Sequence, residues 1–233
     1  IYLINDNCHA IGSKYKGEIK YVCRYADIAT QSYHPVKAIT SGEGGSILTN
    51  NLEINKKVNL LKNHGMLRNE KLSKKNGNWF YSIKNLGYNY RLSDIQCALG
   101  ISQLKKLNKF ILERRKIAKI YDKELVNIKN FEIPIARKNC YHSYHLYPLL
   151  INFKKTKVTK KEFFLNLQSR GIFVQVHYIP IHFHQYYRKN FSFKPGDFPI
   201  SENIYEREVS LPIYPNLKKK IVYKVIKNII KNF

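Results

Sequence analysis

The chain has 233 residues, of which 41 are Lys or Arg and 16 are Asp or Glu, so its formal net charge is +25. Hydrophobic residues make up 44% of the chain and aromatic residues 13%, which excludes a disordered protein, and no apolar run suits a membrane span. A chain of this length accommodates one domain with a smaller one appended.

The positive charge leaves a nucleic-acid-binding protein open as an alternative, because a basic surface attracts phosphates. However, the lysines are spread among many Asn and Ile residues, a mixture that AT-rich codons produce, and no recognisable nucleic-acid-binding module accompanies them. We therefore expect no nucleic-acid partner, and the same charge would favour an anionic substrate. The cysteines form no CxxC pair, so we expect reduced thiols, no disulfide and a cytoplasmic location.

Short apolar runs alternate with glycine-containing turns in the first ninety residues, a pattern typical of an α/β layer. We expect strands at residues 1–4, 26–29 and 46–49, a helix near 53–63 and an exposed loop at 69–77.

Apolar residues recur at helical spacing from Ile95 to Leu125, and Ser93 before them can cap the helix. This pattern predicts one long helix, or two joined end to end, that leads out of the first domain. We place the domain boundary near residue 130, so that residues 1–130 include this helix.

Residues 131–233 predict a small α+β domain. The expected elements are a strand at 146–151, a helix at 159–169 that Gly171 ends, a strand at 173–177, a proline-rich irregular stretch and a last helix at 218–232.

Three residues of the first domain suit one cofactor, pyridoxal phosphate. Asp6 follows a strand, at the edge of a parallel sheet where ligands usually bind, and Ser32 and Lys37 lie in one loop that Pro35 keeps irregular. The aldehyde and phosphate arm of the cofactor leave adjacent ring carbons, whereas the pyridine nitrogen lies across the ring and needs a carboxylate from another segment. Taken singly, Asp6 also suits a turn residue and Lys37 a solvated surface lysine.

Longer motifs resemble a known family. The chain is similar, from Ile1 to its carboxyl terminus, to the sugar aminotransferases of the DegT/DnrJ/EryC1/StrS family. The motifs that carry this resemblance are DNCHAIGSKYKGE, SYHPVKAITSGEGGSILTN, LKNHG, LGYNYRLSDIQCALGISQLKKL and KPGDFPISENIYEREVSLPIYPNL. The resemblance implies the type I fold of pyridoxal-phosphate-dependent transferases, like that of aspartate aminotransferase, with part of a large domain that has a mainly parallel sheet and a small α+β domain.

The resemblance also implies roles for individual residues. Lys37 matches the lysine that holds the cofactor as a Schiff base, Asp6 the aspartate on the pyridine nitrogen and Ser32 the serine on the phosphate. His9 matches the residue that packs against the cofactor ring, and Asn89 an asparagine that reaches the phosphate from the other subunit of a homodimer. Some members of the family carry histidine in place of the lysine and remove a sugar hydroxyl, so Lys37 favours aminotransfer.

Two segments, SYHPVKAITSGEGG and VHYIPIHFHQYYR, most resemble enzymes that add a 4-amino group to a UDP-linked keto sugar in pseudaminic acid biosynthesis. The implied substrates are an amino acid, usually glutamate, and a nucleotide-linked deoxy sugar with a ketone at C4. Lys37 would act as general base and acid in both half-reactions.

The second segment implies a sugar-nucleotide pocket with His177, Tyr178, His182 and Tyr186 as substrate-binding residues. Its aromatic residues equally suit a core or a dimer interface. His182 and His184 form an HxH pair, but no nearby carboxylate or thiol completes a zinc site, so we expect no metal.

The sequence begins at Ile1 and its single methionine is Met66, from which we expect further residues to precede it. In the family, such an amino-terminal portion supplies early strands of the large domain and a phosphate-binding turn. An inactive fragment or a non-catalytic paralogue is therefore the main alternative to an active enzyme.

Overall fold

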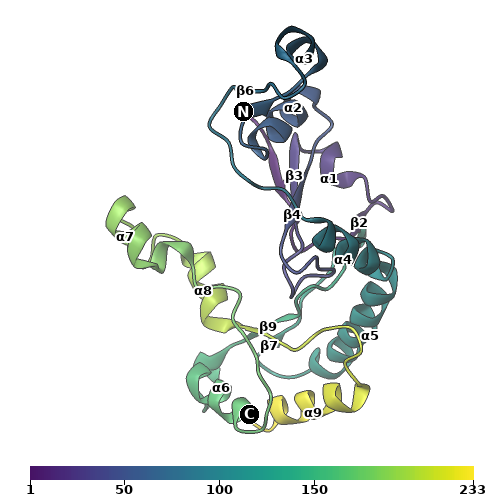
Figure 1. The fold of residues 1–233 in the computed structure, drawn as a ribbon. Coiled ribbons are helices and arrows are strands. Elements are labelled where there is room, and N and C mark those ends of the chain that lie inside the picture. The colour runs from purple at the N-terminus through teal and green to yellow at the C-terminus, as the bar shows by residue number, and fades with distance from the viewer. The chain divides into compact units, whose positions relative to one another are not determined.

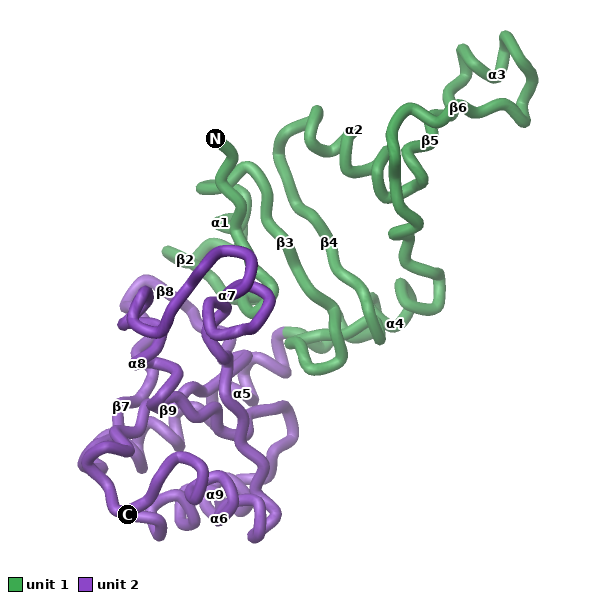
Figure 2. The backbone as a smooth tube through the Cα atoms, turned by 90° about the vertical axis from the view of Figure 1, so that its left-hand side faces the viewer, with its two compact units in different colours: residues 1–107 green, residues 108–233 purple.

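A computed structural model describes residues 1–233, which form two compact units, Ile1–Leu107 and Asn108–Phe233 (Figure 2). The sequence placed the division near residue 130, and the difference concerns the long helix α5 (Leu107–Leu125). Apolar side chains of α5, among them Tyr121 and Leu125, belong to the hydrophobic core of the second unit. The structure therefore divides the chain at the start of α5 rather than after it. The functional domain boundary stays a prediction.

The first unit is an α/β layer built on a three-stranded sheet in the order β1–β3–β4 (Figure 1). β1 and β3 pair in parallel and β3 and β4 antiparallel, so this portion of the sheet is mixed rather than mainly parallel. Its elements are β1 (Ile4–Asp6), β2 (Lys14–Tyr15), α1 (Tyr21–Arg24), β3 (Ile28–Ser32), β4 (Gly45–Leu48), α2 (Leu52–Leu61), β5 (Met66–Leu67), α3 (Glu70–Asn76), β6 (Ser82–Ile83) and α4 (Asp94–Leu104).

Side-chain caps begin three helices of this unit, α2, α3 and α4. Ser93 caps α4 in a capping box with Gln96, and Asn51 accepts two backbone N–H groups at the start of α2. The predicted loop at 69–77 is wrong, because those residues form α3. Asn69 accepts the N–H of Leu72 there, so a local cap starts a short, polar helix that hydrophobic periodicity does not reveal.

Two glycines allow the chain to cross itself closely near β5. A Cβ atom on Gly65, whose φ is +65°, would lie 1.8 Å from the carbonyl oxygen of Asn85, and one on Gly87 would lie 2.1 Å from the nitrogen of Gly65. The close approach allows the backbone of His64 to donate to the carbonyl of Tyr88 at 2.9 Å. This crossing places the following residues, including Asn89, along the 61–64 segment.

The second unit contains a three-stranded antiparallel sheet in the order β10–β9–β7. Its elements after α5 are β7 (Phe131–Glu132), β8 (Cys140–Tyr141), β9 (Pro148–Ile151), η1 (Phe153–Lys155), α6 (Lys160–Gln168), η2 (Ile181–Phe183), α7 (Gln185–Phe191), α8 (Pro199–Arg207), β10 (Glu208–Ser210) and α9 (Lys219–Ile230).

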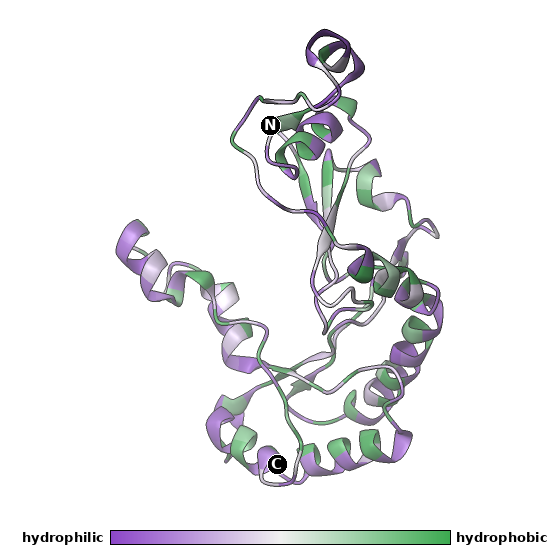
Figure 3. Cartoon of the chain, in the orientation of Figure 1, coloured by the Kyte–Doolittle hydropathy of each residue, from purple (hydrophilic) through white to green (hydrophobic).

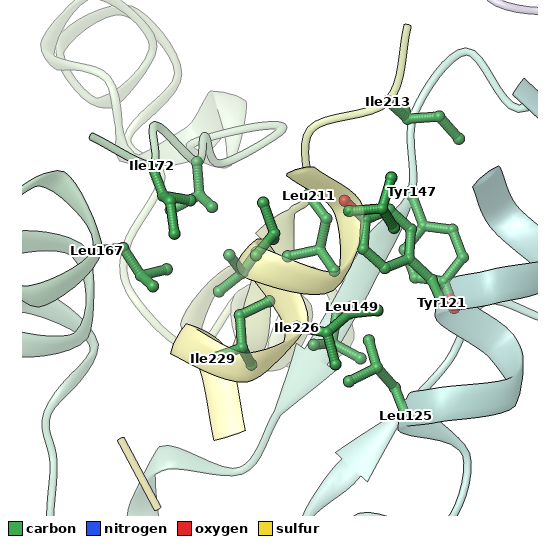
Figure 4. Close-up of a cluster of buried hydrophobic side chains, with 14 of the residues drawn as sticks. Tyr121, Leu125, Tyr147, Leu149, Leu167, Ile172, Leu211, Ile213, Ile226 and Ile229 are labelled. Atoms are coloured by element: carbon green, nitrogen blue, oxygen red, sulfur yellow. The ribbon is translucent and has the colours of Figure 1, made fainter. Parts of the chain in front are cut away.

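The hydrophobic core of this unit joins its sheet to α5, α6 and α9 (Figure 4). Residues of α9 that face it recur at helical spacing, and hydrophobic and hydrophilic stretches alternate along α9 in Figure 3. The buried residues of α9 are Val222, Val225, Ile226 and Ile229. The last helix predicted from the sequence is therefore confirmed.

The predicted strand at 173–177 is wrong. Only Gln175 pairs there, in a single antiparallel bridge with Ser210. The proline-rich stretch, expected to be irregular, contains α7 and α8. Pro199 starts α8 at a position where its missing N–H costs nothing. No helix of the structure is long and apolar enough to cross a membrane.

A buried guanidinium joins α5 to two loops of the second unit. Arg114 is 4% exposed, and its Nη1 donates to the carbonyl oxygens of Tyr144 (3.3 Å), His145 (3.1 Å) and Ile213 (2.7 Å). Burial lowers the pKa of Arg114 to about 10. The guanidinium therefore holds carbonyls that no other element of the core satisfies, at a cost in desolvation.

We expect Arg114→Ala to lower the free energy of unfolding by about 3 kcal/mol, because three carbonyls lose their donor and a cavity forms. Lys116→Ala is the control, since Lys116 is an exposed cation on the same helix. Urea denaturation of both variants measures the difference. Equal stability of the two variants would contradict the role given to Arg114.

We expect Gly65→Ala to lower the free energy of unfolding by more than about 3 kcal/mol, because the added Cβ overlaps a backbone carbonyl. Gly100→Ala is the matched control within α4. Its Cβ would meet only the Cβ of Ser41, at 3.6 Å, so we expect it to raise stability by about 0.5–1 kcal/mol. Thermal unfolding followed by circular dichroism would refute the crossing if both variants behaved alike.

Candidate active site

Asp6 and Ser32 end two neighbouring parallel strands. Asp6 is the last residue of β1 and lies opposite Thr30 of β3, whose own last residue is Ser32. Because parallel strands end at the same edge of a sheet, both side chains lie at one edge, which is where open α/β sheets usually bind ligands. The structure thus brings together two of the residues predicted from the sequence.

The exposed carboxylate of Asp6 is held in its ionised form. The side chain of Cys8 and its backbone N–H, which lies 3.1 Å from Oδ1, lower the pKa of Asp6, and the charges of His9 and Lys37 lower it further against the opposing effect of burial. Burial and the hydrogen bond with Asp6 raise the pKa of the Cys8 thiol, whose Sγ lies 3.8 Å from Oγ1 of Thr30. Asp6 therefore offers a negative charge at neutral pH and interacts electrostatically with His9 and Lys37.

Lys37 lies in a tight turn directly after β3. The N–H of His34 donates to Oγ of Ser32 at 3.4 Å, and the N–H of Lys37 donates to the carbonyl of His34 at 2.9 Å. Lys37 itself is half-buried, and the two residues that follow it, Ala38 and Ile39, are buried. Strand on one side and core on the other thus fix the backbone from which the amine extends.

The turn before β4 packs tightly. Oγ of the buried Ser41 donates to the carbonyl of Glu43 at 2.6 Å, and the N–H of Tyr33 donates to the carbonyl of Gly44 at 2.8 Å. A Cβ on Gly44 would lie 2.6 Å from Cδ2 of Leu92. The φ of Gly44 is +141°, which L side chains rarely adopt, so glycine allows this turn to pack against the 33–41 segment around Lys37.

Asn89 is exposed and makes no hydrogen bond to Asp6, Ser32 or Lys37. Its backbone pairs with Asn63 in an isolated bridge, and the rings on either side of it, Tyr88 and Tyr90, stack at 4.8 Å. The structure therefore presents Asn89 on an exposed segment that a backbone bridge and a ring stack support.

His177 joins a buried polar network in the second unit. Its N–H donates to Oε2 of Glu208 at 2.9 Å, its Nδ1 lies 2.8 Å from Oγ of Ser210, and that hydroxyl donates to Oε1 of Glu208 at 2.6 Å. Glu208 and Ser210 are 2% and 5% exposed. Sequence analysis missed both residues, although their spacing of two in a strand, which places them on one face, was a usable signal.

Two of the four predicted substrate residues line a pocket of about 560 Å³ in the second unit. Tyr178 is 63% exposed, and its ring meets that of His177 edge to face at 4.6 Å. The walls are otherwise largely apolar and aromatic. The lining residues are His177, Tyr178, Asp197, Phe198, Pro199, Ile200, Ser201, Ile204 and Tyr205.

The other two predicted substrate residues do not line this pocket. His182 is 5% exposed, and its Nε2 lies 2.8 Å from Oε1 of Glu202, which also accepts the N–H of Gly196. Burial opposes these contacts, but together they lower the pKa of Glu202. Tyr186 is 66% exposed on α7 and packs against Tyr187. The buried His182 ring is therefore hydrogen-bonded to Glu202 of α8.

No group of three or more His, Cys, Asp or Glu side chains is arranged to hold a metal ion. The His182 ring, half of the HxH pair, is hydrogen-bonded to a carboxylate instead. The chemistry available at the two sites is that of an amine, carboxylates, hydroxyls and an imidazole.

Known proteins resemble the chain over nearly its whole length. It is 42% identical to an uncharacterized protein of Methanocaldococcus jannaschii over 97% of the chain, and 40% identical over 94% of it to a UDP-4-amino-4,6-dideoxy-N-acetyl-beta-L-altrosamine transaminase of Campylobacter jejuni. The chain covers 58% and 55% of these proteins, so it spans little more than half the length of the curated relatives it matches.

Solved structures of sugar aminotransferases share the fold. The structure of a Helicobacter pylori aminotransferase involved in the biosynthesis of pseudoaminic acid superposes with a TM-score of 0.88 at 34% identity, over all of this chain and 60% of that one. The predicted fold, that of a type I aminotransferase in part, is confirmed. Residues 1–230 match a single family along their whole length, and the chain therefore belongs to the DegT/DnrJ/EryC1/StrS aminotransferase family.

Proposed function

We propose that this chain carries the cofactor lysine and part of the substrate pocket of a pyridoxal-phosphate-dependent nucleotide-sugar aminotransferase. The reaction would move an amino group from an amino acid, L-glutamate, to the C4 ketone of a UDP-linked deoxy keto sugar. The observation that carries the proposal is the edge of the β1–β3 sheet, where Asp6, Ser32 and the Lys37 turn meet.

The residues at this edge fit pyridoxal phosphate by their chemistry. Lys37 offers an amine for the aldehyde, Ser32 a hydroxyl for the phosphate and Asp6 an ionised carboxylate for the protonated pyridine nitrogen. His9, whose charge acts on Asp6, would pack against the ring. When bound, the cofactor supplies an electron sink for negative charge on the carbon next to the amino group.

Lys37 would perform the proton transfers. Its amine would take a proton from the α-carbon of the amino acid in the first half-reaction and deliver one to C4 of the sugar in the second. A single base suffices because the two half-reactions are the same chemistry in opposite directions. The fixed turn around Lys37 keeps the backbone still while the flexible side chain moves.

Two features support the proposed substrates and partner. The Campylobacter jejuni relative is named for a UDP-linked amino sugar, and His177 and Tyr178 line a pocket large enough for part of such a molecule. We also propose that a second copy of the chain contributes Asn89 to the site. Large apolar side chains near Asn89, such as Leu86 at 86% and Ile95 at 84% exposure, support a surface that a partner covers. The cytoplasmic location stays a prediction.

The first test is chemical labelling of Lys37. We expect borohydride reduction in the presence of pyridoxal phosphate to attach a phosphopyridoxyl group to Lys37, identified by peptide mass spectrometry, and Lys37→Ala to abolish it. Lys56→Ala, at an exposed lysine of α2, is the control and should leave labelling of Lys37 unchanged. Labelling spread evenly over the surface lysines would favour the alternative of a non-catalytic fragment.

The second test concerns the charge of Asp6. We expect Asp6→Asn to weaken binding of pyridoxal phosphate by about ten- to a hundredfold, because the amide keeps an acceptor for the N–H of Cys8 but loses the ion pair. Asp94→Asn, at an exposed aspartate in the first turn of α4, is the control. Fluorescence titration measures both affinities, and equal values for the two variants would refute the role of Asp6.

A further inference from the structure

The buried carboxylate of Glu208 has no role in the proton transfers proposed above. Carboxylates are rarely buried unless they are paired, yet Glu208 is 2% exposed at the start of β10. Each of its oxygens accepts one hydrogen bond, Oε1 from the hydroxyl of Ser210 and Oε2 from the backbone N–H of His177. Both bonds lead to His177 of the pocket wall. One comes directly from its backbone, and the other comes from Ser210, which also contacts the His177 ring.

The direction of these hydrogen bonds decides the protonation of the His177 ring. Both carboxylate oxygens of Glu208 act as acceptors, so the proton of the Ser210 hydroxyl points to Oε1 of Glu208 at 2.6 Å. The serine oxygen must then accept from His177, whose Nδ1 lies 2.8 Å away. The proton of the neutral ring therefore lies on Nδ1, and Nε2 becomes the acceptor nitrogen.

A cation accompanies this network. Burial lowers the pKa of Lys160, and attraction to Glu208 and Glu206 partly offsets that effect. The Lys160 ammonium donates to the carbonyl of Tyr205 and lies 5.0 Å from the centre of its ring, which lines the same pocket. Glu208 and its neighbours thus connect to two walls of the pocket.

We propose that Glu208 and Ser210 are positioning residues that hold His177 in the tautomer with the proton on Nδ1. His177 then offers an acceptor to the ligand, which must supply a hydroxyl or an N–H donor. This inference rests on the proposed function, in which His177 contacts the nucleotide sugar. Glu208 and Ser210 would thereby select ligands that offer His177 a hydrogen-bond donor.

Glu208→Gln tests the inference with little change of shape. The amide keeps one acceptor for the N–H of His177 and presents an NH₂ group to Ser210, so the serine hydroxyl must turn and donate to Nδ1 of His177. We expect the proton of the ring to move to Nε2, and ¹⁵N chemical shifts of histidine-labelled protein report this directly. Ser210→Ala should also remove the preference for Nδ1.

The control is Glu206→Gln, which removes the same charge from a half-exposed glutamate that pairs with Lys154 and does not contact His177. It should leave the tautomer unchanged. Circular dichroism confirms that each variant is folded, and if Ser210→Ala is not, Glu208→Gln alone decides. An Nδ1 proton that persists in Glu208→Gln overturns the inference.

Titration with UDP connects the tautomer to the ligand. We expect Glu208→Gln to weaken UDP affinity by up to about tenfold, the effect of one lost hydrogen bond, and Glu206→Gln to leave it unchanged. Undiminished affinity in Glu208→Gln, or UDP that shifts no His177 resonance in the unaltered chain, overturns the ligand-positioning role. These measurements contain no pyridoxal phosphate, so their failure is distinct from a failure of Lys37 labelling.

Discussion

The candidate cofactor site depends on the parallel pairing of β1 with β3. This pairing places Asp6 opposite Thr30, so that two segments distant in the sequence end at one edge of a sheet. A slip of one residue would turn Asp6 to the other face of the sheet, because side chains alternate along a strand. The rest of the first unit supports this edge: the 42–45 turn closes over the 33–41 segment, and buried residues directly after Lys37 hold it against the core.

The second unit relies on two buried charges of opposite sign. Arg114 satisfies three loop carbonyls and Glu208 satisfies a backbone N–H and a hydroxyl, so each replaces hydrogen bonds that the short three-stranded sheet does not provide. Burying a charge is costly, and hydrogen bonds offset part of that cost here, although Nε of Arg114 has no partner. In both cases the structure that results is a loop held in one conformation, and for Glu208 that loop bears His177 of the pocket.

Local signals in the sequence predicted helices well where a cap was followed by apolar residues at helical spacing, but they did not reveal the polar helix α3 after its cap Asn69. Ser93 began α4 as expected, and the apolar spacing of the last helix matched the buried face of α9. Prediction failed where distant residues decided the outcome. The 173–177 segment has the composition of a strand, but only Gln175 finds a partner, and that partner is Ser210. The role of His182 as a substrate residue stays a prediction, and its ring contacts Glu202, another distant residue.

The sequence by itself determined the family, because its motifs extend in order along the whole chain. It also predicted cofactor roles for Lys37, Asp6 and Ser32, from their chemistry together with the family resemblance. Only the tertiary structure decided that Asp6 and Ser32 share an edge, that His177 and Tyr178 line a pocket while His182 does not, and that Glu208 and Ser210 contact the His177 ring. The physical reason is that hydrogen bonds and burial depend on which distant residues meet. Residue type and spacing describe what a side chain can do, and packing decides which partner it finds.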